Sequence, residues 1–83
     1  MKEFEVRFDI KFLNSFKKLD KNYQERTQKL INKIILNPRI GKPMKNVRKG
    51  TRELYLKPFR ISYELNEQKL IIIFLEIYYK NKQ

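Results

Sequence analysis

The sequence predicts an α+β fold: an N-terminal strand, a helical hairpin, and then an antiparallel β-meander with the helices packed on one face of the sheet. Three observations lead to this prediction. Apolar and charged residues alternate near the N-terminus, apolar residues then recur every three or four positions in two segments, and the C-terminal half holds β-rich runs separated by short turns. Eighty-three residues without an internal repeat or linker are expected to form one domain, residues 1–83.

The first strand is expected at residues 4–8, where apolar and charged residues alternate. Asp9 can cap the helix that follows, because its side chain can accept a hydrogen bond from a free backbone amide of the first turn. Phe12 falls outside the apolar stripe of this helix and is expected to cover an edge. The expected stripe consists of Ile10, Leu13, Phe16 and Leu19.

A second helix is expected after Asp20, which is again placed to act as the N-cap. Proline disfavours the helical conformation of the residue before it, so Pro38 sets the end of this helix at Leu36 or Asn37. The two helices together form a hairpin with one apolar face. On the second helix that face is expected to consist of Tyr23, Thr27, Leu30, Ile31 and Ile34.

The C-terminal half is expected to form antiparallel strands at residues 52–57, 59–65 and 69–79. The turns between them, at residues 57–58 and 66–68, are short enough for hairpins. A shorter strand is expected at residues 44–48, inside the loop that follows the second helix. Because residues 70–75 are apolar throughout, the last strand should have a central position, with the helices on one side.

Strand alternation divides the side chains between a core face and the opposite face of the sheet. The core positions of the first two long strands are Leu54, Leu56, Phe59, Ile61, Tyr63 and Leu65. On the last strand, the positions expected to face the helices are Ile71, Ile73, Leu75, Ile77 and Tyr79, and those expected to face away are Ile72, Phe74, Glu76, Tyr78 and Lys80. Glu53 falls on the opposite face, which also gathers the six residues of a candidate functional site: Tyr55, Lys57, Arg60, Glu76, Tyr78 and Lys80.

Residues 38–60 carry a strong excess of positive charge. They include eight Lys and Arg residues and one acid, Glu53, and so contribute +7 of the total net charge of +11. Such charge on strands and turns predicts a polyanionic partner such as RNA. The alternatives are a merely solvated surface, a structural ion pair between Arg60 and Glu76, and rim packing by the tyrosines. The candidate RNA-binding residues are Lys42, Lys45, Arg48, Lys49 and Arg52.

The chain contains no histidine and no cysteine. Disulfides and thiolate metal sites are therefore excluded, a zinc site is not expected, and no cofactor is indicated. Any acid–base chemistry has to use Lys, Arg, Tyr, Asp or Glu. The longest apolar run, residues 70–75, is far shorter than the roughly 20 residues of a membrane-spanning helix, and the N-terminus does not resemble a signal peptide. A cytoplasmic protein is expected.

Three motifs, taken in order, resemble the RelE/ParE superfamily of toxins from toxin–antitoxin systems. They are residues 37–43 after the second helix, residues 53–63 across two predicted strands, and residues 76–80 at the end of the last strand. The resemblance implies a small toxin that a co-encoded antitoxin binds and neutralises, with a toxin–antitoxin heterotetramer as one form of that complex. RelE-type members cut mRNA in the ribosomal A site, and ParE-type members poison DNA gyrase. A noncatalytic RNA- or antitoxin-binding relative is a third alternative.

The resemblance also implies roles for individual residues. Arg60 corresponds to the arginine that follows an aromatic residue in the RelE active site, Lys57 to a basic residue of the preceding strand, and Lys80 to the arginine at the end of the last strand. Tyr55 stands where RelE has a second lysine. RelE has a catalytic tyrosine in a C-terminal segment, and Tyr78 and Tyr55 are the candidates for that role here.

Such residues suit metal-independent RNA cleavage. The 2′-hydroxyl of the RNA is itself the nucleophile, and it has to be deprotonated and aligned with the adjacent phosphate. The planar guanidinium of Arg60 can donate two hydrogen bonds to that phosphate, and Lys80 would add a second cation. The identity of the general base stays open between Lys57, Glu76 and a tyrosinate.

Overall fold

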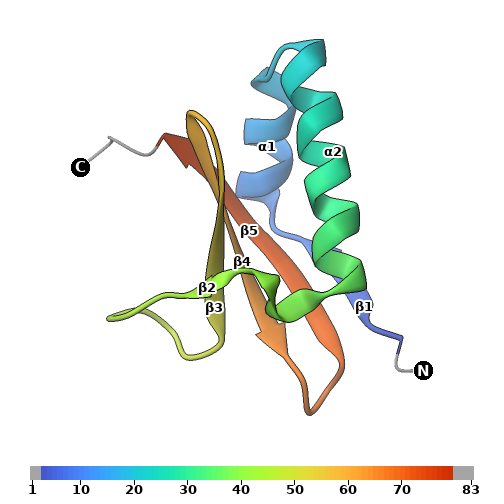
Figure 1. Cartoon of the computed structure of the whole chain (residues 1–83), viewed down its shortest axis with the longest axis vertical. Helices are drawn as coiled ribbons and strands as arrows, with labels where there is room; N and C mark the ends of the chain where they lie inside the picture. Colours follow the sequence, from blue (N-terminus) through green and yellow to red (C-terminus); the bar gives the residue numbers. More distant parts are fainter. Residues whose placement is uncertain (1–2, 80–83) are drawn as a thin grey trace.

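The computed structural model describes residues 3–79, which form two helices on one side of a five-stranded sheet (Figure 1). Among these residues, no helix combines the length and the apolar character that crossing a membrane requires. The elements are, in chain order, β1 (Glu5–Phe8), α1 (Ile10–Lys18), α2 (Lys21–Leu36), the 3₁₀ turn η1 (Pro38–Ile40), β2 (Lys42–Pro43), β3 (Thr51–Leu56), β4 (Phe59–Asn66) and β5 (Ile71–Tyr79).

The strand order in the sheet is β1-β5-β4-β3-β2. Strands β3, β4 and β5 form the predicted antiparallel meander. Strand β1 lies beside β5 and runs parallel to it, and the long connection that a parallel pair requires consists of the two helices and strands β2 to β4. Strand β5 therefore has a neighbour on each side, in agreement with the position predicted from its apolar run.

Both predicted helix caps are confirmed. The Asp9 carboxylate accepts a hydrogen bond of 2.9 Å from the Lys11 amide, and the Asp20 carboxylate accepts one of 2.9 Å from the Tyr23 amide. Helix α2 ends at Leu36, directly before the residue that Pro38 restricts. Its predicted face is also confirmed, with Thr27, Ile31 and Ile34 buried and Tyr23 and Leu30 half-buried.

The predicted apolar stripe of α1 is partly wrong. Phe12, which the sequence placed at an edge, is 1% exposed, whereas Ile10 and Leu13 are 65% and 40% exposed. Only Asp9 separates β1 from α1, so the parallel pairing of β1 with β5 determines how the helix is rotated about its axis. This rotation brings the Phe12 ring to 5.5 Å from the Phe74 ring, between their centroids.

The facing of β5 changes along its length, which the sequence did not predict. In the register with β4, Ser62 pairs with Glu76 and Tyr63 pairs with Phe74, so the intervening Leu75 forms a β-bulge. Before the bulge the prediction is reversed: Ile72 and Phe74 are buried against the helices, and Ile71, Ile73 and Leu75 lie on the opposite face. After the bulge the prediction is correct, because Ile77 faces the core and Glu76 and Tyr78 face away.

The strand predicted at residues 44–48 is absent from the described residues. Strand β2 instead comprises Lys42–Pro43, which pairs with β3 so that Lys42 lies opposite Glu53. The loop that follows contains left-handed backbone at Asn46 (φ 62°) and Gly50 (φ 93°). Such angles are incompatible with a continuous strand, so these residues curve away from the sheet.

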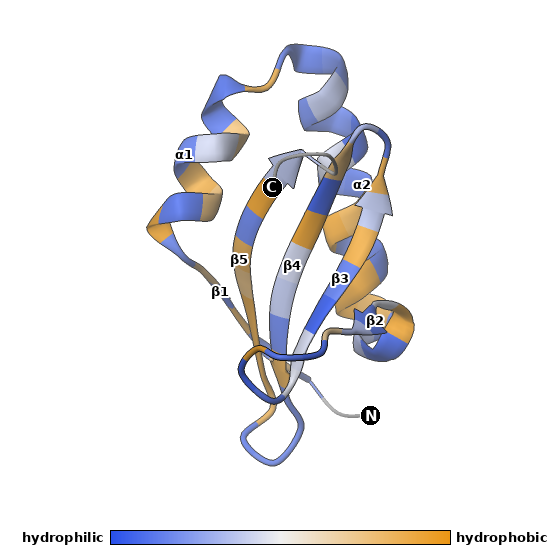
Figure 2. Ribbon diagram, turned by 90° about the vertical axis from the view of Figure 1, so that its left-hand side faces the viewer, coloured by the Kyte–Doolittle hydropathy of each residue, from blue (hydrophilic) through white to orange (hydrophobic). Residues whose placement is uncertain are grey.

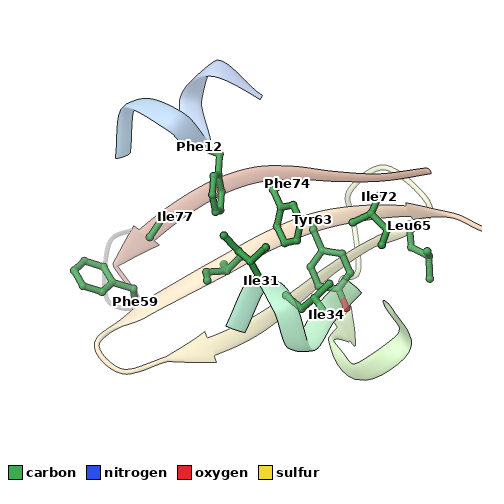
Figure 3. Packing of buried hydrophobic residues seen from close by; sticks show 10 residues of the cluster. Phe12, Ile31, Ile34, Phe59, Tyr63, Leu65, Ile72, Phe74 and Ile77 are labelled. Carbon is green, nitrogen blue, oxygen red and sulfur yellow. The ribbon is translucent and has the colours of Figure 1, made fainter. Parts of the chain in front are cut away.

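The core lies between the helices and the sheet, and Tyr63 at its centre is fully buried (Figure 3). The Tyr63 hydroxyl donates a hydrogen bond of 2.6 Å to the Pro38 carbonyl and accepts one of 2.8 Å from the Gly41 amide. A Cβ atom at Gly41 would lie 2.5 Å from the Tyr63 hydroxyl, so this close approach requires glycine. Tyr63 thereby anchors the start of the basic segment to the core.

Candidate functional site

The face of the sheet opposite the helices carries a row of three polar side chains. In the strand register, Tyr55 of β3 lies opposite Arg60 of β4, and Arg60 lies opposite Tyr78 of β5. Directly paired residues of antiparallel strands point to the same face, so these three side chains share it. In Figure 2, the strands β3, β4 and β5 that carry this row lie in front of α2.

Glu53 connects two members of this row, Arg60 and Tyr78. Its carboxylate accepts a hydrogen bond of 2.7 Å from Nη1 of Arg60 on one oxygen, and one of 2.6 Å from the hydroxyl of Tyr78 on the other. The first contact is an ion pair whose side chains are 34% exposed at Arg60 and 19% exposed at Glu53. Charge-assisted bonds of this length and partial burial are stronger than surface ion pairs.

Within the described part of the chain, the rest of the Arg60 guanidinium has few other partners. The guanidinium carbon lies 6.0 Å from the centroid of the Tyr55 ring, at the outer limit of a cation–π contact. The Nε–H group is buried and makes no hydrogen bond to any of residues 3–79. The alternative ion pair between Arg60 and Glu76 is not formed, because Arg60 pairs with Glu53 instead.

Tyr78 holds its proton unusually tightly. Partial burial disfavours the charged phenolate, and the hydrogen bond to the Glu53 carboxylate adds to this effect, so that the pKa of Tyr78 rises to about 12. At neutral pH the Tyr78 hydroxyl is therefore a hydrogen-bond donor. Of the general bases that the sequence left open, a tyrosinate at Tyr78 is disfavoured.

The remaining candidate catalytic residues are less constrained. Glu76 is exposed on the same face, opposite Ser62 in the strand register. Lys57 is exposed in the turn between β3 and β4. Lys80 lies outside the described residues. Of the six candidates, the structure thus brings Tyr55, Arg60, Glu76 and Tyr78 together on one face, and their catalytic roles stay a prediction.

The candidate RNA-binding cations fall into two groups. Lys42, Lys45, Arg48 and Lys49 are exposed on β2 and in the loop after it, and Arg48 approaches Glu64 at 3.6 Å. Arg52 differs from them. Its Nη1 donates hydrogen bonds to the carbonyls of Arg39 (3.0 Å) and Gly41 (2.6 Å), so its guanidinium braces the segment before β2.

An open cavity of about 530 Å³ lies between this loop and the sheet, next to the polar row. Its walls are mixed, since apolar side chains from the loop and from the bulge meet polar side chains of the strands. The residues that line it are Met44, Val47, Arg48, Thr51, Ser62, Glu64, Leu75, Glu76 and Tyr78. Within residues 3–79, no group of three or more acidic, His or Cys side chains is placed to hold a metal ion.

Glu53 is the residue that sequence reasoning missed. Strand alternation places Glu53 on the same face as Arg60 but indicates no role for it. One signal in the sequence pointed to it, because Glu53 is the single acid among the residues from 38 to 60. An isolated acid within a basic segment is expected to find a cationic partner when the segment folds.

Comparison with known proteins agrees with this architecture. Three similar solved structures are the isolated RelE toxin of E. coli (17% identity, TM-score 0.80, covering 96% of this chain and 87% of that chain), the toxin–antitoxin complex RelBE2 of Mycobacterium tuberculosis (18%, 0.80, 95% and 100%) and the archaeal RelE–RelB complex of Pyrococcus horikoshii (15%, 0.79, 99% and 100%). At such identities these similarities establish the RelE fold.

No curated protein matches the chain. A protein family does: residues 6–83 match the family described as ParE toxin of type II toxin–antitoxin system, parDE. This match spans nearly the whole sequence, and it agrees with the resemblance of the three motifs and with the fold. The chain therefore belongs to the ParE toxin family, within the RelE/ParE superfamily of toxin–antitoxin toxins.

Proposed function

We propose that this toxin is a ribosome-dependent endoribonuclease that cleaves mRNA without a metal ion, by attack of a 2′-hydroxyl on the adjacent phosphate. The observation that carries the proposal is the convergence of Arg60 and Tyr78 on one point of the sheet face, within 2.7 and 2.6 Å of the two oxygens of a single carboxylate. Two donors that converge on an oxyanion are what a phosphoryl group in the transition state requires.

Each residue of the site has a role in this proposal. The Arg60 guanidinium binds the scissile phosphate, and Tyr78, which keeps its proton at neutral pH, donates a hydrogen bond to a phosphoryl oxygen. Tyr55 is 48% exposed beside Arg60 and offers its ring to an unpaired base. Lys57 and Glu76 remain the candidate general bases.

The exposed cations of β2 and its loop supply affinity that does not depend on sequence. Lys42, Lys45 and Lys49 point into solvent beside the site and can follow the phosphates of the ribosomal RNA or of the message. The total charge of +11 also favours an acidic antitoxin as the cytoplasmic partner. The solved complexes of RelE-fold toxins with antitoxins support this partner, and a heterotetramer with it is the assembly we propose.

Primer extension on an mRNA under translation tests the proposal. Addition of the wild-type toxin is expected to create new 5′ ends, and Arg60→Ala is expected to slow cleavage by about 100-fold or more, the usual cost of removing one oxyanion donor. Lys29→Ala, an equal change of charge on the exposed face of α2, serves as the control and is expected to cleave normally. Cleavage by Arg60→Ala at the wild-type rate contradicts the mechanism.

Inhibition of DNA gyrase is the second candidate function. The family match to ParE toxins favours it, and so does the pairing of Glu53 with Arg60, which neutralises the main cation of the site. A gyrase supercoiling assay on the same preparation separates the two. Loss of supercoiling with intact mRNA supports the gyrase function, and a protein that affects neither is a noncatalytic binding relative.

A further inference from the structure

The point at which Arg60 and Tyr78 converge is already occupied. The Glu53 carboxylate accepts a hydrogen bond from each of them, one on each oxygen. A carboxylate and a phosphate seek the same donors, because both are anions that accept hydrogen bonds through several oxygens. In the free protein, Glu53 therefore takes the place that the proposed function assigns to the phosphate.

A phosphate cannot simply be added to this arrangement. It would face the negative charge of Glu53 within a partly buried site, where like charges repel more strongly than in water. The N–H group of Arg60 that bonds Glu53 and the hydroxyl proton of Tyr78 would also be unavailable to it. Binding of a phosphate at these two donors consequently requires the carboxylate to leave.

The neighbouring strand offers the carboxylate a second partner. Lys42 of β2 lies directly opposite Glu53 of β3, so the two side chains share a face. The Lys42 side chain is exposed, and both residues line one cavity of about 350 Å³ together with Tyr55 and Arg60. A change of Glu53 rotamer toward β2 would thus exchange the Arg60 ion pair for one with Lys42, without movement of the backbone.

We propose that Arg60 and Tyr78 form a phosphate-binding site that Glu53 closes in the free toxin, and that an RNA phosphate opens it by displacing the Glu53 carboxylate toward Lys42. The inference rests on the proposed function only in taking RNA phosphate as the ligand. Glu53 is then a gating residue, which lowers the affinity of the resting site and holds Arg60 and Tyr78 in position for the oxyanion that replaces it.

Binding of a 2′-O-methyl oligoribonucleotide tests the gate independently of cleavage, because this probe lacks the attacking hydroxyl. Fluorescence anisotropy at an ionic strength of about 0.15 M would compare the wild type with Glu53→Gln, which removes the charge and keeps the shape. The variant is expected to bind the probe about tenfold more tightly, the size of one hydrogen bond to a charged group. Affinity equal to or weaker than that of the wild type overturns the proposal.

The matched control is Glu25→Gln, which changes the net charge by the same amount on the exposed surface of α2. It is expected to alter the affinity by less than about twofold, because its charge is screened from the site by salt and distance. An equal gain in both variants would assign the effect to net charge and overturn the gate.

Lys42→Ala tests the second position of Glu53 in an otherwise wild-type chain. Loss of the Lys42 ammonium is expected to weaken probe binding by about fivefold. Lys45→Ala removes a loop cation that is not paired with Glu53 in the strand register, and it is expected to weaken binding by about twofold. The difference between the effects of the two lysine variants should vanish when both are made in the Glu53→Gln background. Equal effects of the two lysines, or an excess that persists in that background, contradict the displacement.

The gate and the nuclease fail in different assays. If the wild-type toxin leaves translated mRNA intact while Glu53→Gln tightens probe binding, the nuclease proposal is refuted and the gate stands. If the toxin cleaves mRNA and Glu53→Gln does not tighten binding, the gate is refuted and the nuclease stands.

Discussion

At the scale of single residues, the strong positive charge of the basic segment does not lie on the sheet face that carries the candidate site. Residues 38–60 contribute +7, yet on the sheet face Arg60 is paired with Glu53, and a second acid, Glu76, lies on the same face. The excess of positive charge is instead carried by exposed lysines on β2 and its loop. We infer that the loop supplies long-range attraction for a polyanion, whereas the sheet face supplies geometry.

The titration of Tyr78 reports on its bond to Glu53. In Glu53→Gln, the pKa of Tyr78 is expected to fall from about 12 toward the ordinary value of 10 without reaching it, because burial, the larger cause, remains. Tyrosine ring ¹³C NMR across pH 9–13 would measure the shift. An unchanged pKa would mean that the carboxylate does not accept this bond in solution.

The same raised pKa has a defined effect on folding. The native state keeps the Tyr78 proton to a higher pH than the unfolded chain does. The contribution of this protonated Tyr78 to the free energy of unfolding is therefore fully present below pH 10. This contribution is lost as the pH rises from 10 through about 12, because the tyrosine of the unfolded chain ionises at a lower pH than Tyr78 of the native state. The free energy of unfolding of the wild type is therefore expected to decline over this window more steeply than that of Tyr78→Phe, measured by urea denaturation.

At the scale of elements, short helices rely on their caps and on the contacts between them. Helix α1 has nine residues, too few to be stable alone in water, and the Gln24 side chain of α2 donates a hydrogen bond of 3.1 Å to the Phe16 carbonyl of α1. The cap at Asp20 lies at the turn of this hairpin, so it fixes both the start of α2 and the direction in which the chain turns.

Replacement of the Asp20 cap is expected to weaken the hairpin. In Asp20→Ala the Tyr23 amide loses its acceptor, and the free energy of unfolding should fall by about 1 kcal/mol, as measured by urea denaturation. Asp20→Asn retains an acceptor oxygen and should remain close to the wild type. A loss of the same size in both variants would show that the carboxylate acts through its charge rather than through the cap.

At the scale of the whole molecule, one core holds the helices, the meander and the basic segment together. Phe12 of α1 and Ile31 of α2 pack on strand residues of β4 and β5, as Figure 3 shows. Tyr63 extends this core through its hydroxyl to the segment after α2. The segment that leads into the cationic loop and the polar row are consequently held by opposite faces of the same strand, β4.

The rotation of α1 can be tested through stability. Phe12→Ala is expected to reduce the free energy of unfolding by about 3–5 kcal/mol, because a fully buried aromatic ring would leave a cavity between α1 and β5. Ile10→Ala, at a position that is 65% exposed, should change it by no more than about 0.5 kcal/mol. Denaturant unfolding of both variants measures this. The reverse order of effects would restore the stripe that periodicity alone predicted.

Several features of this protein followed from local sequence. These features are the caps at Asp9 and Asp20, the end of α2 before Pro38 and the alternation of β4. Each depends on residues within a few positions of one another, so the local sequence pattern is enough to predict it. The face shared by Tyr55 and Arg60 followed from the same alternation, since the turn between β3 and β4 is short.

Other features depended on contacts between distant parts of the chain. The rotation of α1 is set by the parallel pairing of β1 with β5, the bulge at Leu75 reverses the facing of half of β5, and Glu53 meets Tyr78 across 25 positions of sequence. None of these can be read from periodicity, because a one-residue change of register moves every following side chain to the other face. The sequence by itself determined where the two helices and the four longer strands form and what chemistry they carry, but not the position of the short strand β2. Tertiary structure decided which acid lies on Arg60, because only the assembled sheet brings β3, β4 and β5 side by side.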